Sequence, residues 1–179
     1  EDTYICVTEA LKAAAAWNDV NLDLRWINAE KVDDKMLSEV DGLVVPGGFG
    51  NRGVEGKIAA ANYALDHDVP YLGLCLGMQV ACIASARRAG LTQANSEEFD
   101  KETKENVIYL MDGQEGKEST GGSMRLGDFP AKLVKGSQTA KIYGKTNIVE
   151  RHRHRYEVNQ KFLKEIEKGG VVVSGTSPD

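Results

Sequence analysis

Hydrophobic and polar positions in the first part of the chain follow first a helical and then a strand-like period. Residues 3–17 carry apolar side chains at helical spacing after a potential N-cap at Asp2, so they predict a helix. The positions expected to face inward are Ile5, Ala10, Leu11 and Ala14. Residues 21–27 alternate instead, with Leu22, Leu24 and Trp26 on one face, and predict a strand.

Two further apolar runs, residues 42–46 and 71–74, lack alternation and are typical of strands buried on both faces. Helical patterns at residues 31–40, at 57–66 and after Gly77 separate or follow these strands. This succession predicts an α/β fold, a mainly parallel central sheet with helices on both faces. In such folds the functional site lies at the carboxyl ends of the strands.

The second half of the chain is less regular. Residues 95–104 are polar, 113–122 form a glycine-rich stretch expected to be a mobile loop, and 160–168 predict a helix. Strands are expected at 107–111, 124–126, 131–134, 148–158 and 171–174, with some of them forming a small antiparallel annex. Because there is no internal repeat and no linker, we expect one domain over residues 1–179.

Composition narrows the class of protein. Of 179 residues, 41% are hydrophobic and 27% charged, which is typical of a soluble globular protein. The net charge of -5 argues against nucleic-acid binding, and the absence of an 18-residue apolar run argues against a membrane span. The start, Glu1-Asp2-Thr3, is not that of a signal peptide, and the cysteines (Cys6, Cys75 and Cys82) lack disulfide or zinc spacing. These features predict a reducing, cytoplasmic location.

The sequence Gly73-Leu74-Cys75-Leu76-Gly77 stands where the strand pattern changes to a helical one. A G-x-C-x-G motif between a strand and a helix is the thiol version of the nucleophile elbow. Glycines are needed two residues before and two residues after the cysteine, because a side chain at either position would collide with the neighbouring strand or helix. The helix N-terminus favours the thiolate form of Cys75. The alternative is an ordinary buried cysteine, but the two glycines and the change of period favour a nucleophile.

Pro46-Gly47-Gly48 ends the preceding buried strand. Glycines let the backbone approach a ligand closely and turn N–H groups toward it, as in an oxyanion hole. One such donor stabilises a transition state by about 3 to 4 kcal/mol. A plain turn after a strand is the alternative, and only the neighbouring elbow makes the functional interpretation the stronger one.

Residues 150–157 form a second unusual stretch, Glu-Arg-His-Arg-His-Arg-Tyr-Glu. On a strand the arginines face one way and the histidines the other; these residues are Arg151, Arg153, Arg155, His152 and His154. A guanidinium suits bidentate capture of a carboxylate. The alternative is a solvated edge strand with ion pairs. Either histidine is a possible base for Cys75, although the strand direction argues against it, and His67 is expected to be exposed.

Taken together, these motifs resemble the class I (triad) glutamine amidotransferase domain of CTP synthases. The resemblance covers nearly the whole chain and rests on five stretches: Pro46-Gly47-Gly48-Phe49-Gly50, residues 73–79, Asn95-Ser96-Glu97-Glu98-Phe99, residues 121–127 (Gly-Gly-Ser-Met-Arg-Leu-Gly), and residues 150–159. The first two occur in many amidotransferases, whereas the last two point to CTP synthases in particular.

The resemblance implies a role for each of several residues. Cys75 would attack the side-chain amide of L-glutamine, and the γ-glutamyl thioester would then be hydrolysed. Gly48 and the N–H of Leu76 would form the oxyanion hole. The substrate-binding residues implied are Gly48, Leu76, Gly77, Met78, Gln79, Glu98 and Arg155, with Arg155 on the α-carboxylate and Glu98 on the α-ammonium.

The resemblance also implies partners. The ammonia would pass to a synthetase domain of the same enzyme, which makes CTP from UTP with ATP and Mg; GTP would be an activator. No metal or cofactor is expected in the glutaminase domain itself. The full-length enzyme is expected to form a homo-oligomer.

Three departures from the family pattern qualify this interpretation. The family's catalytic His and Glu belong to a His-Pro-Glu motif that would follow Asp179, its first strand would precede Thr3, and the synthetase domain has no counterpart here. We therefore expect a glutaminase domain that is incomplete at both ends. Two alternatives stay open: a domain that binds glutamine without turning it over, and a cysteine-elbow protein of the DJ-1/PfpI type.

Overall fold

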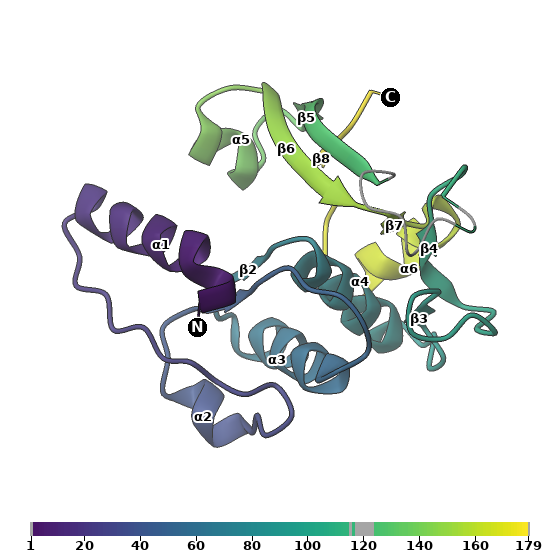
Figure 1. Cartoon of the computed structure of the whole chain (residues 1–179), viewed down its shortest axis with the longest axis horizontal. Helices are drawn as coiled ribbons and strands as arrows, with labels where there is room; N and C mark the ends of the chain where they lie inside the picture. Colours follow the sequence, from purple (N-terminus) through teal and green to yellow (C-terminus); the bar gives the residue numbers. More distant parts are fainter. Residues whose placement is uncertain (1, 115, 117–123, 179) are drawn as a thin grey trace. The chain divides into compact units, whose positions relative to one another are not determined.

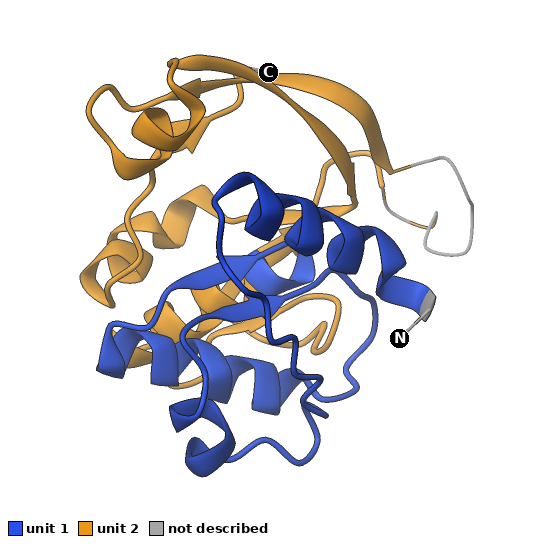
Figure 2. Ribbon diagram, turned by 90° about the vertical axis from the view of Figure 1, so that its left-hand side faces the viewer, with its two compact units in different colours: residues 1–78 blue, residues 79–179 orange. Residues whose placement is uncertain are grey.

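The computed structural model describes residues 2–114, 116 and 124–178. The chain divides into two compact units, residues 1–78 and 79–179, which are coloured separately in Figure 2. The boundary falls inside one helix, α4 (Leu76–Arg88), just after the predicted elbow. Most of the glycine-rich stretch 113–122, and residues 121–123 of the family motif, lie outside the described residues.

The first unit contains the strand and helix succession that the sequence predicts (Figure 1). Its elements are η1 (Asp2–Tyr4), α1 (Ile5–Trp17), α2 (Asp34–Ser38), β1 (Leu43–Val45), α3 (Val54–His67), β2 (Tyr71–Gly73) and the start of α4. Strands β1 and β2 are parallel, with Leu43 opposite Tyr71 and Val45 opposite Gly73. The two predicted strands are therefore confirmed as neighbours, with their carboxyl ends on the same edge. The prediction that β2 is buried on both faces is wrong, because Leu72 is 51% exposed.

The core of the first unit lies between α2, α3 and β1. Leu37 of α2, Leu43 of β1 and Ala60 and Ala64 of α3 form one buried cluster. Val54, Ile58 and Ala61 of α3 are also buried, and this spacing of three to four residues is that of a helix with one apolar face. Packing of this face holds the parallel strand pair in place.

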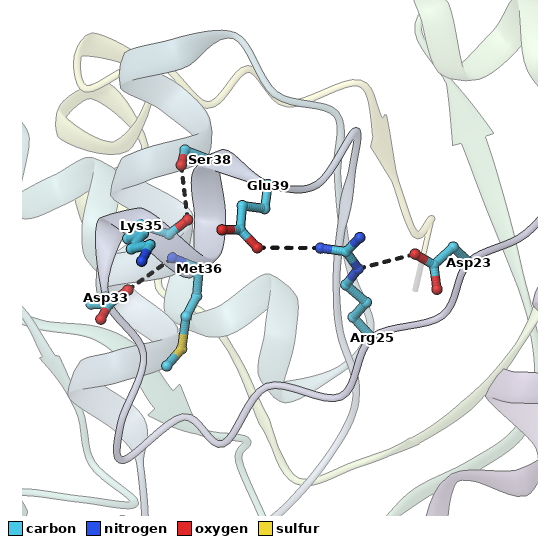
Figure 3. A network of polar contacts seen from close by, with 7 residues as sticks. All are labelled: Asp23, Arg25, Asp33, Lys35, Met36, Ser38 and Glu39. Carbon is cyan, nitrogen blue, oxygen red and sulfur yellow. Dashed lines mark hydrogen bonds and ion pairs between the residues drawn. The ribbon is translucent and has the colours of Figure 1, made fainter.

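The predicted strand at residues 21–27 does not form, and the segment is without regular secondary structure. Leu22, Leu24 and Trp26 are exposed rather than buried on one face. Alternation produces a strand only where a neighbouring strand bonds the backbone, and no described strand of this unit pairs with the segment. Figure 3 shows that Arg25 instead bridges Asp23, at 3.0 Å, and Glu39, at 3.4 Å.

Helices α1 and α2 also differ in detail from the prediction. Helix α1 begins at Ile5 with Tyr4 as its N-cap, and none of its residues is buried, so the predicted inward face is wrong within this structure. Helix α2 spans Asp34–Ser38, shorter than predicted, because Asp33 caps it by accepting a hydrogen bond from the Met36 N–H at 2.8 Å (Figure 3).

The second unit contains two three-stranded sheets. Its strands are β3 (Asn95–Ser96), β4 (Asn106–Leu110), β5 (Arg125–Leu133), β6 (Asn147–His154), β7 (Tyr156–Val158) and β8 (Gly175–Thr176), and its helices besides α4 are α5 (Gln138–Tyr143), η2 (Gln160–Phe162) and α6 (Leu163–Lys168). In one sheet β4 lies between parallel β3 and antiparallel β7. In the other, β5 lies between β6 and β8 and is antiparallel to both.

The antiparallel annex is thereby confirmed, but its strands are longer than predicted. Strand β5 joins the two short strands expected at 124–126 and 131–134, and it pairs with β6 from Arg125 opposite His154 to Lys132 opposite Asn147. The strand predicted at 171–174 is wrong, since the pairing residues are Gly175–Thr176. In the described part of the chain no helix has both the length and the apolar character needed to cross a membrane.

The single strand predicted at 148–158 is divided in two by Arg155. Strand β6 ends at His154 and pairs with β5, whereas β7 begins at Tyr156 and pairs with β4. Arg155 is thus the one residue at which the backbone passes from one sheet to the other (Figure 1). This break changes the direction that the sequence assigned to its side chain.

Candidate active site

Cys75 lies in the tight turn between β2 and α4 and has a φ of +52°. This left-handed conformation is strained for a residue other than glycine, and such strain is typical of functional sites. The turn is held by two backbone hydrogen bonds, from the Leu74 N–H to Val45 at 2.9 Å and from the Gly77 N–H to Leu74 at 2.9 Å. The predicted elbow is therefore present, with its strand end bonded to β1.

The two glycines of the motif are required by close backbone approach. A Cβ atom placed on Gly77 would lie 1.9 Å from the carbonyl oxygen of Val45, and one on Gly73 would lie 2.5 Å from the carbonyl carbon of Gly77. Both distances are shorter than any van der Waals contact, so the collisions expected from the sequence are confirmed. The Tyr71 hydroxyl also donates to the Gly77 carbonyl at 2.8 Å, a contact that the sequence pattern gave no reason to expect.

The Gly47–Gly48 loop lies against the elbow. A Cβ atom on Gly47 would be 3.4 Å from Cβ of Cys75, and one on Gly48 would be 3.3 Å from Cδ2 of Leu76. Leu76 is the first residue of α4, and the N–H groups of a first helical turn have no acceptor within the helix. The first unit thus brings the nucleophile candidate close to both predicted oxyanion-hole residues.

The other two cysteines have different surroundings. Cys82 lies on α4 and is buried, and its burial raises the pKa of the thiol to about 12. Cys6 lies on α1 and is exposed. Cys75 is partly exposed and is the one of the three at a strained turn. A buried thiol with a raised pKa is a poor nucleophile, so Cys82 is a packing residue.

Glu98 follows β3 in a turn fixed by its neighbours. Its N–H donates to the hydroxyl of Ser96 at 3.2 Å, and Ser96 is fully buried. The preceding carboxylate, that of Glu97, accepts hydrogen bonds from the Leu110 N–H at 2.8 Å and from the Asn106 side chain. Glu97 therefore ties the turn to β4, while Glu98 is partly buried beside it.

Arg155 is 9% exposed, and its carbonyl accepts a hydrogen bond from the Met111 N–H at 2.9 Å. The Glu98 turn is bonded to β4 at Ile108 and Leu110, and the Arg155 bend is bonded just beyond, at Met111. The neighbour of Glu98 in the chain, Glu97, and the Arg155 carbonyl are thus bonded to β4 and to the residue that follows it. Gln79, another predicted binding residue, is 3% exposed and donates from Nε2 to the Tyr156 carbonyl at 3.2 Å.

The predicted common face of the three arginines is corrected by the break in the strand. Arg151 and Arg153 are exposed on β6, whereas Arg155 lies beyond its end and is buried. Arg151 is 3.8 Å from Asp128 of β5, in a pair whose side chains are 74% and 70% exposed. For Arg151 the solvated edge-strand interpretation is therefore confirmed.

The three histidines also separate into two kinds. His67 is exposed, as predicted, stacks on Tyr63 and contacts its carbonyl at 3.0 Å. His152 and His154 are partly buried, and Nδ1 of His152 lies 2.8 Å from Nε2 of His154. Burial lowers the pKa of both, and the charge of Arg125 lowers them further. We assign neither of them the role of base for Cys75, against which the strand direction argued.

Comparisons with known proteins agree with this geometry. The sequence model of the family "Glutamine amidotransferase class-I" matches residues 1–179. The chain belongs to the class I glutamine amidotransferases. The amidotransferase chain is 50% identical to CTP synthase of Roseiflexus castenholzii over 99% of its own length, and 51% identical to CTP synthase of Lactiplantibacillus plantarum over 100%. It spans about a third of those relatives, 33% and 34%.

A solved structure, described as the Trypanosoma brucei CTPS glutaminase domain with bound acivicin, has a TM-score of 0.88 to the amidotransferase chain. The two are 41% identical, and the match covers 97% of this chain and 69% of that one. The likeness confirms the predicted α/β class with parallel strands, helices and an antiparallel sheet. It also confirms the resemblance to CTP synthase glutaminase domains and favours it over the DJ-1/PfpI interpretation.

Proposed function

We propose that this domain hydrolyses L-glutamine to glutamate and ammonia through a thioester on Cys75. The observation that carries the proposal is the backbone of Cys75, strained at a φ of +52° between a strand end and a helix start. The Gly47–Gly48 loop lies beside the elbow, and we assign its backbone amides to the oxyanion hole. A nucleophile beside such donors is the arrangement that acyl transfer needs.

The chemistry proceeds in two steps. The Cys75 thiolate attacks the carbon of the side-chain amide, and the oxygen becomes an oxyanion that the N–H groups of Gly48 and Leu76 stabilise. The amide nitrogen takes a proton and leaves as ammonia, which produces the γ-glutamyl thioester. Water then attacks the thioester, releases glutamate and restores the thiol. We assign the proton transfers to the His and Glu that the resemblance expects beyond Asp179.

Recognition of glutamine is proposed to rest on Arg155 and Glu98. Glutamine carries a carboxylate and an ammonium on one carbon, so its pocket needs one cation and one anion. Support comes from the burial of Arg155 and from the bonds that tie its carbonyl to Met111 and the residue before Glu98 to Ile108 and Leu110. The resemblance adds Gly77, Met78 and Gln79, at the start of α4, to the proposed substrate-binding residues.

The ammonia is proposed to serve the amination of UTP to CTP. Support comes from the relatives, which are CTP synthases about three times as long as this chain. A synthetase domain of the same enzyme would then use ATP, Mg and UTP, with GTP as activator, in a homo-oligomer. The cytoplasmic location expected from composition stays a prediction.

Labelling by a glutamine-like electrophile tests the proposal. An acivicin-type reagent, followed by peptide mass spectrometry, should modify Cys75 and spare Cys6 and Cys82. L-Glutamine should protect Cys75, whereas a DJ-1/PfpI-type protein would show no such protection. A small neutral thiol reagent is the control and should also reach exposed Cys6. Equal labelling of all three cysteines by the glutamine analogue would refute the assignment.

A further inference from the structure

Hydrogen bonds hold the backbone bend at Arg155, between β6 and β7, on both sides. On one side the Arg155 carbonyl accepts from Met111 at 2.9 Å. On the other, the Tyr156 carbonyl accepts two side-chain donors, Nε2 of Gln79 at 3.2 Å and Nδ1 of His154 at 3.1 Å. His154 is the last residue of β6 and Tyr156 the first of β7, so this last contact spans Arg155.

The partners of the two histidines determine their tautomers. A carbonyl oxygen only accepts, so Nδ1 of His154 carries the hydrogen that bonds Tyr156. In neutral His154 the other nitrogen, Nε2, is then an acceptor, and the hydrogen of the 2.8 Å contact sits on Nδ1 of His152. The two rings and the Tyr156 carbonyl thus form a directed chain of two hydrogen bonds.

The surroundings keep this chain neutral near pH 7. Burial and the charge of Arg125, which stands opposite His154 in the β5–β6 register, lower the pKa of both histidines. The Tyr156 carbonyl and the Glu157 carboxylate raise the pKa of His154, and the Glu150 carboxylate raises that of His152, but each acts more weakly than burial. Phe129 of β5 contacts His152 edge-on, with ring centroids 5.3 Å apart. With both rings neutral, the histidine pair adds no cation beside the bend to compete with the Arg155 guanidinium for a carboxylate.

We propose that His154 is a positioning residue for glutamine, because its Nδ1–H bond to the Tyr156 carbonyl spans and fixes Arg155, with His152 orienting the His154 ring. The inference rests on the proposed function and deepens it, since Arg155 is there the partner of the α-carboxylate. His154 touches no reacting atom in this scheme. It therefore affects how tightly glutamine is held and leaves the chemistry at Cys75 unchanged.

Two substitutions at one position test the inference in the full-length synthetase. An asparagine places its side-chain N–H₂ where Nδ1 of histidine stands, whereas a glutamine places its amide near Nε2. His154→Gln should raise the KM for L-glutamine about fivefold, the equivalent of one hydrogen bond of about 1 kcal/mol, with kcat unchanged. His154→Asn should restore the KM to within about twofold of wild type.

The matched control is His67→Gln, which removes the other histidine contact to a backbone carbonyl and should leave the KM unchanged. CTP formation from free ammonia should stay at wild-type level in all three variants, because ammonia does not need the glutamine pocket. An unchanged KM in His154→Gln, an equal rise in both His154 variants, or a parallel fall of the ammonia-dependent rate would overturn the inference.

Failure of the proposed function would be seen in a different measurement from failure of this inference. A wild-type enzyme that releases no ammonia from glutamine would refute that function, while calorimetric glutamine affinities of the same variants would still decide the role of His154. Weaker affinity in His154→Gln with recovery in His154→Asn would support positioning. Equal affinities, or no glutamine binding by the wild type, would refute it.

Discussion

Replacing Arg155 with alanine removes the cation that the proposed function places on the α-carboxylate of glutamine. The structure indicates a large effect because Arg155 is only 9% exposed, so water has little access to the carboxylate left behind. Truncating one partner of a desolvated charge pair costs about 2 to 5 kcal/mol. Since 1.4 kcal/mol corresponds to a factor of ten, the KM for glutamine should rise at least about tenfold.

Arg151→Ala is the matched control, four residues away on the same segment. Its side chain is 74% exposed, and it forms an ion pair with the carboxylate of Asp128 at 3.8 Å. Exposed pairs of this kind contribute at most about 1 kcal/mol to stability. Arg151→Ala should therefore leave the KM for glutamine unchanged. Arg155→Lys, which keeps the charge but loses the planar fork, should fall between Arg155→Ala and wild type.

The assay measures CTP formation by the proposed full-length synthetase at varied glutamine and, separately, at varied ammonia. The substrate role predicts a rise in KM for glutamine in Arg155→Ala together with a nearly unchanged ammonia-dependent rate. If both rates fall together, Arg155 supports the fold or a domain interface, and its role on the α-carboxylate is refuted. An equal rise of KM in Arg151→Ala would refute the reasoning from burial.

Two further predictions concern stability. Gly77→Ala should lower the free energy of unfolding by at least about 1 to 3 kcal/mol in urea denaturation, because its Cβ would lie 1.9 Å from the Val45 oxygen. Gly42→Ala, whose Cβ would be no closer than 3.5 Å to any atom, is the control, and equal losses would contradict the steric argument. The free energy of unfolding should also fall as the pH drops below about 6.5, because the pKa of His152 and of His154 is lowered by folding, so that the unfolded chain binds protons that the folded chain does not. In the double variant His152→Gln/His154→Asn, the free energy of unfolding should depend less on pH between pH 7 and pH 5. If its slope against pH equals that of the wild type, the histidine pair does not contribute.

Local chemistry made the candidate nucleophile predictable. A change from strand to helix period, a cysteine at the change and a glycine two residues away on each side describe one tight turn. The φ of +52° at Cys75 and the close approach of Gly77 to Val45 are the physical counterparts of that pattern. Backbone sterics over five residues leave few alternatives, so the sequence alone was enough.

Partners distant in the sequence decided the remaining features. The alternation at residues 21–27 was as regular as that of a strand, yet no described strand of its unit bonds to it. The histidine pair and the contact between Gln79 and Tyr156 likewise depend on side chains brought together by folding.

Arg155 shows most directly which features the sequence predicts and which the tertiary structure decides. In one regular strand, where side chains alternate between the two faces, residue 155 would lie on the same face as Arg151 and Arg153. In the structure the segment leaves β5 after His154 and joins β4 at Tyr156, and this change of partner buries Arg155 while Arg151 stays in solvent. The sequence determined which side chains are candidates for the chemistry, because their types and local spacing are written in it. Tertiary structure decided which arginine is desolvated, because burial depends on which strands pair, and that pairing is a property of the whole fold.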